Sequence, residues 1–377
     1  MSLRFVRCAV GEVTWILRDK ILLLSCTWNI YAFFRRTRNS DSMMTRTLLR
    51  LGDTSRCVFT TAQYYRPKMQ VLHYRQIRSL KKSQISFRSE SPFPNYVESG
   101  TVPPTRLLKH LSFTIMFSGA SIMGAAIWEY ERIRNQTYQL IHRYRQFRVN
   151  RTGWRAEIET WWRNLTEGQK IFVPICFINA VVFLAWRMPA LQRTMVRYFS
   201  VNPASSMSCW SMVLATFSHY SLFHLAANMF VLHSFSTIAV AALGKEQFVA
   251  LYLSSGVISS FVSNVYKTVF RIPGYSLGAS GAILGIIGFV CTQYPDIRLS
   301  IIFLPMFTFT AGMALKGLIA LDTVGCILRW KYFDHAAHLG GALFGIFWQA
   351  WGSAYIWQKR EPLLTFWHEL REPRRSQ

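Results

Sequence analysis

Polar side chains that can take part in hydrolysis occur inside otherwise apolar stretches of this sequence. Ser280 follows a Gly-Ala pair, and His338 begins a His-Leu-Gly-Gly segment. A serine hydroxyl becomes an effective nucleophile only beside a base, and imidazole has a suitable pKa for that task. His224 and Asn228 lie four residues apart, so a helix places both on one face, from which they can stabilise an oxyanion. Together these residue types predict amide hydrolysis by a serine nucleophile.

Glycines accompany the candidate serine and histidine at helical spacing. Gly281 and Gly285 form one stripe, Gly341 and Gly345 form another, and Gly278 lies just before the serine. Small residues four apart let two membrane helices approach closely. We therefore expect the helix that carries the serine to pack face to face against the helix that carries the histidine.

Each of these residues also has a purely structural interpretation. Serine in a membrane helix usually bonds its own backbone, and an intramembrane histidine or asparagine commonly ties helices together. His335 lies one turn before His338 on the same face, so spacing alone does not identify which histidine would be the base. The co-occurrence of the serine, the histidines, the asparagine and the glycine stripes favours catalysis.

The composition indicates a membrane protein. The chain has 377 residues and 43.7 kDa, with 51% hydrophobic and only 16% charged residues, against about 25% charged in soluble domains. Such a composition excludes intrinsic disorder and argues against an ordinary soluble enzyme. The net charge of +25 would suit nucleic acid or an anionic membrane, but its concentration in residues 1–110 favours a membrane protein with no nucleic-acid partner. The seven scattered cysteines form no Cys-x-x-Cys pair, which excludes a zinc-ribbon site.

The N-terminal segment has the composition of a targeting sequence. Residues 1–60 are rich in Arg and Ser and poor in acids, which is typical of a mitochondrial transit peptide. The apolar stretch 21–34 offers a secretory signal as a rival, but basic residues resume at Arg35 without a clear small-residue cleavage site. A disordered basic tail is the third alternative.

The boundaries of this leader are not defined by the sequence. Met43 and Met44 are alternative starts to Met1, and no residue marks the cleavage site. Residues 61–110 stay polar and basic and contain several prolines, so they lack the apolar residues of a core. We expect them to form a flexible segment on one side of the membrane.

The rest of the chain contains apolar stretches with lengths that fit membrane helices, since about 20 apolar residues cross the hydrocarbon. One isolated span is expected at 111–128, followed by a polar spacer at 129–170 with tryptophans suited to an interface helix. Six closely spaced helices follow, at 171–186, 222–243, 248–265, 277–292, 311–328 and 336–356. An apolar connecting stretch at 299–310 precedes the fifth of these, and a polar tail at 358–377 ends the chain.

The predicted fold class is all-α, because a helix satisfies every backbone group within one segment in lipid. We expect a polytopic bundle of seven spans, with a six-helix core at 171–357 and one additional N-terminal transmembrane helix. Basic residues precede the first span, but 129–170 is basic too, so the orientation stays open. The glycine stripes serve helices of one chain or of two, which leaves the oligomeric state open. A channel is disfavoured because the spans offer only Lys316 and Asp322 as charges.

Three segments, taken together, resemble the signature segments of rhomboid intramembrane serine proteases and occur in that family's order. They are 219–228, 278–281 and 337–341 with Gly345. The resemblance covers about 170–357. The isolated helix before the core, the basic leader and the stretch 302–310 resemble the mitochondrial presenilin-associated rhomboid-like branch, with which the likeness runs over about 112–369.

Position by position, the resemblance implies that Ser280 is the nucleophile, His338 the general base, and His224 and Asn228 the oxyanion-stabilising pair. It thereby selects His338 over His335 as the base. It also implies a rhomboid-like six-helix core whose site lies in a water-filled cavity below the membrane surface. No metal or organic cofactor is implied, and no acid that orients the base.

The resemblance further implies substrates that are single-span proteins of the mitochondrial inner membrane, with helices that unwind readily at small or helix-breaking residues. Among them would be an import-arrested kinase of mitophagy signalling and proteins of cell-death and membrane-fusion control. A non-catalytic rhomboid-like scaffold that binds transmembrane helices is the alternative. The catalytically dead relatives lack the serine or the histidine, whereas this chain has both.

Two positions depart from the bacterial members of that family. The Tyr that stacks on their catalytic histidine corresponds to Leu284 here, and the Trp-Arg pair of their first long loop corresponds to Trp210-Ser211. These departures concern how the base is held and how the loop docks. Neither removes a reactive group.

Overall fold

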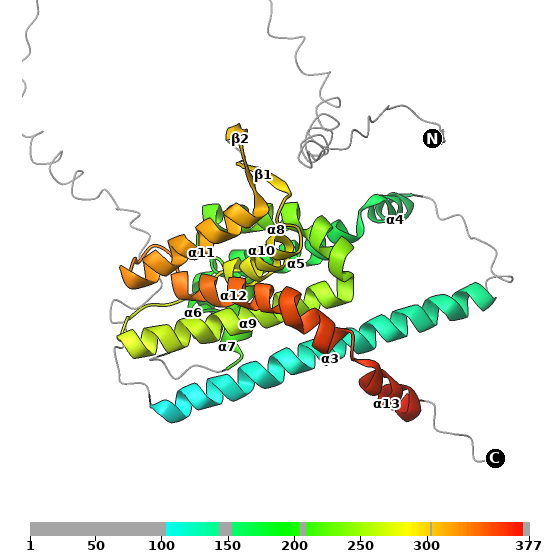
Figure 1. Ribbon diagram of the computed structural model, residues 1–377, viewed down its shortest axis with the longest axis horizontal. Coiled ribbons are helices and arrows are strands. Elements are labelled where there is room, and N and C mark those ends of the chain that lie inside the picture. Colours follow the sequence, from blue (N-terminus) through cyan, green and yellow to red (C-terminus); the bar gives the residue numbers. More distant parts are fainter. Residues whose placement is uncertain (1–102, 143–152, 204–208, 302–303, 372–377) are drawn as a thin grey trace, which may run out of the picture. The chain divides into compact units, whose positions relative to one another are not determined.

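The computed structural model describes residues 103–142, 153–203, 209–301 and 304–371, all within the compact unit Pro92–Gln377 (Figure 1). The predicted leader at 1–60 and nearly all of the segment at 61–110 lie outside these residues. The described chain is mostly helical, as the apolar runs predict. Its elements form three groups: long apolar helices, shorter core helices, and peripheral elements.

Within the part of the chain that the structure describes, four helices are long and apolar enough to cross a membrane. They are α3 (Pro104–His142), α5 (Glu167–Ala185), α8 (Leu222–Leu243) and α9 (Lys245–Phe270). They overlap the first four predicted spans. Sequence signals set their ends: Thr166 Oγ1 accepts from the N–H of Gln169, whose side chain accepts from the N–H of Thr166, and this capping box starts α5.

Three further segments of the core are shorter. Helix α10 (Ser280–Gln293) is an apolar helix of 14 residues, α11 spans Ala311–Ile327, and α12 (His335–Phe347) continues into a π-helical segment, η4 (Trp348–Trp357). They overlap the predicted spans at 277–292, 311–328 and 336–356. The seven-span count stays a prediction, since only four helices of the described residues meet the length and hydropathy of a full crossing.

The structure differs from the predicted elements in two places. Helix α3 continues to His142, well past the predicted end at 128, so the polar spacer begins inside a helix. The stretch 299–310 forms an antiparallel hairpin of β1 (Arg298–Ile301) and β2 (Leu304–Thr310), with Arg298 opposite Thr310. The all-α description therefore holds for the bundle but not for this connection, where alternating β-branched and aromatic residues favour strands.

The peripheral elements are short. Helix α4 (Trp154–Asn164) contains no buried residue and carries three exposed tryptophans. The loop between α5 and α8 contains four short helical turns: η2 (Pro189–Leu191), α6 (Gln192–Tyr198), α7 (Ser211–Leu214) and η3 (Ala215–Phe217). Helix α13 (Glu361–Arg371) lies in the predicted tail, where the indole N–H of Trp367 donates to Glu131 of α3 at 3.0 Å.

Helix α9 is the central element of the bundle. It packs against α3, α10 and α12, and half of its residues are buried (Figure 1). Its buried Glu246 pairs with Arg132 of α3 at 2.5 Å, which anchors the additional helix to the core. A buried carboxylate is tolerated because its charge is paired. The core thus positions α10 and α12 side by side on α9.

Candidate active site

Ser280 and His338 meet across two helices. Ser280 is the first residue of α10, and His338 lies in the first turn of α12. The Oγ of Ser280 lies 2.9 Å from Nε2 of His338, within hydrogen-bond distance. Both side chains are partly buried, and the imidazole keeps 16% of its side-chain surface exposed. A serine hydroxyl that donates to an imidazole nitrogen is the arrangement that activates a nucleophile.

The glycine stripes lie where α10 and α12 touch. A methyl group on Gly341 would meet the backbone carbonyl of Gly281, and one on Gly345 would meet that of Gly285. On its other side, α10 lies against Ser255 and Ser259 of α9, whose side chains occupy the space that a methyl group on Gly285 or Gly281 would need. Only glycine permits this approach, which brings the serine and the histidine within reach of each other.

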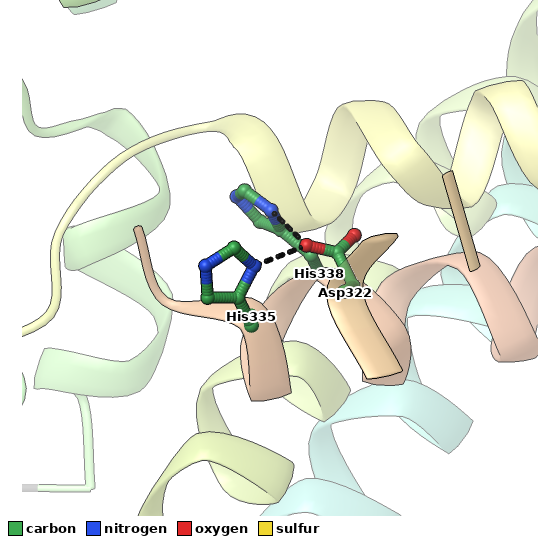
Figure 2. A group of neighbouring side chains, drawn as sticks. All are labelled: Asp322, His335 and His338. Carbon is green, nitrogen blue, oxygen red and sulfur yellow. Dashed lines mark hydrogen bonds and ion pairs between the residues drawn. The ribbon is translucent and has the colours of Figure 1, made fainter. Parts of the chain in front are cut away.

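A carboxylate lies beside the candidate base. Oδ1 of Asp322, on α11, is 3.2 Å from Nδ1 of His338, the ring nitrogen that faces away from the serine (Figure 2). The side chain of Asp322 is 7% exposed. The resemblance implied that no acid orients the base, whereas in this chain a carboxylate contacts it. The contact arises because the register of α11 against α12 places Asp322 beside the histidine.

His335 contacts the same oxygen of this carboxylate. Its Nδ1 lies 2.6 Å from Oδ1 of Asp322, and its Nε2 has no hydrogen-bond partner among the described residues (Figure 2). Gly325, one turn along α11, leaves room for the ring, because a methyl group there would lie 2.5 Å from the imidazole. Spacing left two histidines as candidates for the base, and the structure places His338, not His335, against Ser280.

The same cluster is the set of donors that could bind a metal. One ligand atom each from Asp322, His335 and His338 lies within 4.8 Å of the others, the only such group found among the described residues. Two imidazoles and a carboxylate are zinc-type ligands. In this arrangement the three donors already satisfy one another by hydrogen bonding, so the cluster is explained without a metal ion.

A second carboxylate fixes the start of α12. Asp334 is the N-cap residue and accepts from the N–H of Ala337 at 3.1 Å, while its other oxygen pairs with Lys267 of α9 at 3.1 Å. The same oxygen accepts hydrogen bonds from Ser263 at 2.5 Å and from Ser276. Asp334 therefore ties α9 and the loop before Ser280 to the helix that carries His338.

The charge of Asp334 is stabilised in place. Burial alone would raise the pKa of Asp334, but the ammonium of Lys267 and the hydrogen bonds it accepts outweigh burial and hold this pKa below its usual range. The carboxylate is thus ionised at neutral pH. An ionised N-cap also interacts favourably with the positive end of the helix.

The predicted oxyanion pair lies near the start of α10. His224, on α8, lies against Gly278, where a methyl group would be 2.7 Å from its ring. Gly278 has φ +135°, a conformation that disfavours other residues. Asn228 donates its amide to the His224 carbonyl at 2.8 Å, which is a bond within its own helix. The first N–H groups of α10, which begins at Ser280, lack intrahelical partners and are therefore available as further donors.

A further histidine holds the residue before the serine. Nε2 of His219 accepts from the N–H of Ala279 at 3.3 Å, and its ring lies 4.9 Å from that of His224. Burial, and then the neighbouring His224, lowers the pKa of His219 to about 3, so the ring is neutral and can accept. Its role is to fix the backbone that leads into Ser280.

Comparison with known proteins identifies the family of this chain. The rhomboid domain family matches residues 206–355. The mitochondrial presenilin-associated rhomboid-like protein of Homo sapiens is 54% identical over 275 residues, which cover 71% of this chain and 73% of that protein. The chain belongs to this rhomboid family. The bovine relative (Bos taurus) is 50% identical over 303 residues, 75% of this chain and 80% of that protein, and rhomboid protein 1 of Saccharomyces cerevisiae is 32% identical over 198 residues, 52% and 57% respectively.

The family assignment confirms the resemblance drawn from the three signature segments. The rhomboid family includes serine proteases, and the relatives named above are mitochondrial. Within this family the described structure also accounts for the two departures from bacterial rhomboids. Phe333, in the loop before α12, places its ring 6.3 Å from that of His338, whereas Leu284 is buried in the core. Trp210 packs edge-on against Phe113 and Phe117 of α3, which docks the first long loop on the additional helix.

The sequence did not predict three polar residues of this rhomboid site. Asp322 is a charge in an apolar run, which signals a function, but the sequence does not identify the residues that it contacts. Lys267 and Asp334 lie at helix ends, where charges are ordinary, so no pattern marked them as a pair. An acidic residue just before a Gly-rich apolar helix is, in retrospect, the N-cap signal for Asp334.

Proposed function

We propose that this protein is an intramembrane serine protease of the mitochondrial inner membrane that cleaves the transmembrane segments of single-span proteins. Ser280 is the nucleophile and His338 the general base. The proposal rests chiefly on one observation: the Ser280 hydroxyl and the His338 imidazole, which come from different helices, lie 2.9 Å apart at the start of α10. Simple helix packing does not require a serine at that position to face a histidine.

The chemistry follows from this contact. Ser280 Oγ attacks the scissile carbonyl while Nε2 of His338 takes its proton, and the C–N bond breaks as His338 returns that proton to the leaving amine. Water then attacks the acyl-enzyme, with His338 again as base, and releases the new carboxyl end. The negative oxygen formed in each step would be stabilised by the N–H groups at the start of α10 and by His224.

The length of α10 supports a site inside the membrane. A helix of 14 residues is about 21 Å long, against roughly 30 Å of hydrocarbon. A serine at the end of such a helix can lie several ångströms below the membrane surface while still open to water. Because hydrolysis consumes water, the site needs this access, and unpaired polar groups tolerate such depth only beside a water-filled cavity.

The biological setting is proposed by resemblance. Two relatives, 50% and 54% identical over the matched residues, are mitochondrial, and we propose that this chain lies in the inner mitochondrial membrane. Its substrates would then include an import-arrested kinase of mitophagy signalling and proteins of cell-death and membrane-fusion control. A substrate helix that unwinds at small or helix-breaking residues would expose its scissile bond to the serine most easily.

The test is cleavage of a fluorogenic transmembrane substrate in proteoliposomes. Wild type should cleave it, Ser280→Ala and His338→Ala should show no detectable cleavage, and Ser234→Ala should match wild type. Ser234 is a suitable control because it is exposed on α8 and donates only to the Phe230 carbonyl of its own helix. Cleavage that survives in Ser280→Ala would contradict the proposal. Substrate that binds wild type without being cut would instead support the rhomboid-like scaffold.

A further inference from the structure

The carboxylate of Asp322 contacts two histidines at once, which the packing of α11 against α12 does not by itself require. It comes from α11, is nearly fully buried, and accepts from Nδ1 of two histidines that lie one turn apart on α12 (Figure 2). One of those histidines is the proposed general base. We propose that Asp322 is a positioning residue for the base His338, and that His335 in turn fixes Asp322; this inference rests on the proposed protease activity.

The contact decides which ring nitrogen of His338 carries the proton. A carboxylate oxygen only accepts, so a neutral His338 that bonds it must keep its proton on Nδ1. Nε2 is then unprotonated and can accept the hydroxyl proton of Ser280, 2.9 Å away. With the proton on Nε2 instead, the imidazole would donate to the serine and could not act as a base. The tautomer required for catalysis is therefore the one that Asp322 stabilises.

The same carboxylate stabilises the charged intermediate state. When His338 takes the serine proton it becomes an imidazolium with N–H groups on both nitrogens. Its positive charge then lies 3.2 Å from the nearer oxygen of Asp322, in a site with little exposed surface. An opposite charge at this distance stabilises the imidazolium that forms during attack on the carbonyl.

His335 accounts for how Asp322 is held. Its contact with Oδ1 is the shorter of the two, 2.6 Å against 3.2 Å, so it restrains the carboxylate more tightly than the base does. The side chain of His335 is 5% exposed and lies beside the ring of Trp330, at 5.7 Å. Its Nε2 has no hydrogen-bond partner among the described residues, so His335 is linked to the serine only through Asp322 and His338. It fixes the acid and does not itself exchange protons with substrate.

A purely structural role is the competing explanation. Asp322 could serve only to bind α11 to α12, and its loss would then destabilise the bundle without a specific effect on turnover. The two explanations differ in what they predict for kcat and KM. A residue that fixes the tautomer of the base acts on the chemical step, so its loss lowers kcat and leaves KM nearly unchanged.

The experiment measures kcat and KM for the fluorogenic transmembrane substrate in proteoliposomes, together with thermal unfolding. Asp322→Asn should lower kcat on the order of 10²-fold, with KM within about twofold of wild type. His335→Ala should lower kcat by about tenfold, because Asp322 loses the shorter of its contacts but stays in place. Glu246→Gln is the matched control, because it neutralises another buried carboxylate, which lies in the first turn of α9 and pairs with Arg132 of α3. This variant should reduce stability while kcat stays near wild type.

Each result decides between the explanations. Folded Asp322→Asn protein with wild-type kcat would overturn the proposal, and so would an equal loss of kcat in Glu246→Gln. If Asp322→Asn does not fold, His335→Ala carries the test, and unchanged turnover in that variant overturns the proposal that His335 fixes Asp322 for catalysis. Failure of the proposed function is distinguishable, since wild type itself would then show no cleavage that depends on Ser280.

Discussion

The contact between α10 and α12 yields a quantitative prediction for Gly341→Ala. A methyl group at Gly341 would lie 2.8 Å from the carbonyl carbon of Gly281, about 0.6 Å inside the 3.4 Å at which ordinary contacts begin, and it would meet the carbonyl oxygen more closely still. Helix α12 must therefore move away from α10. Because the contact with the oxygen is the closer one, 0.6 Å is a lower bound on this movement, and the distance from Ser280 Oγ to His338 Nε2 grows from 2.9 Å to at least about 3.5 Å, the limit of a useful hydrogen bond.

Two effects should follow from this displacement. Overpacking of a close helix contact costs about 1–3 kcal/mol of stability, and a misplacement approaching 1 Å at a catalytic pair lowers turnover on the order of 10²-fold. We expect Gly341→Ala to show both effects. Thermal unfolding in detergent measures the first, and the rate of covalent labelling by a fluorophosphonate measures the second.

Gly317→Ala supplies the control for this prediction. Gly317 lies on α11, where a methyl group meets nothing within 4 Å, so the substitution should leave labelling unchanged and slightly favour the helix, by about 0.5–1 kcal/mol. If Gly341→Ala labels as fast as Gly317→Ala and unfolds at the same temperature, the two helices do not meet as described.

Three further predictions concern the start of α12, the docking of the first long loop and the location of the protein. Asp334→Asn should lower stability by roughly 2–4 kcal/mol, because the ion pair with Lys267 and the hydrogen bonds from Ser263 and Ser276 are lost, although the amide oxygen can still cap α12. Because the pKa of Asp334 is held below its usual range, wild type should lose this contribution as pH falls below about 4, and unfolding curves for the variant should lack that dependence. Trp210→Ala should lower stability by roughly 1 kcal/mol through lost ring contacts with α3, with labelling unchanged; a large loss of labelling would contradict the docking role. The acceptor patterns at Asn135 and Asn164 should stay unglycosylated in a mitochondrial protein, and a glycosidase-sensitive mass shift would place it in the secretory route.

The sequence predicted the helices well because lipid leaves few alternatives. An apolar run of the right length must form a helix there, and the small-residue stripes indicated which faces meet. Gly281 and Gly341 lie at the contact between α10 and α12 for this reason. The pairing of Ser280 with His338 follows from the same two stripes, although spacing alone did not separate His338 from His335.

The parts that escaped prediction depend on contacts between elements distant in sequence. In the sequence, the hairpin at 298–310 is a short apolar stretch. Periodicity alone does not distinguish a strand from a helix in a stretch of this length. The contact of Asp322 with His338 depends on the register of α11 against α12, which packing sets and no local pattern records. A charge inside an apolar run signals a function, but only the fold supplies its partner.

Covalent labelling with a fluorophosphonate, followed by mapping of the adduct by mass spectrometry, tests the central claim most directly. The account predicts a single adduct on Ser280 in the wild-type protein in lipid, and its loss when His338 is replaced by alanine. An adduct on another serine, or equal labelling of Ser280 in His338→Ala, would contradict the assignment of nucleophile and base.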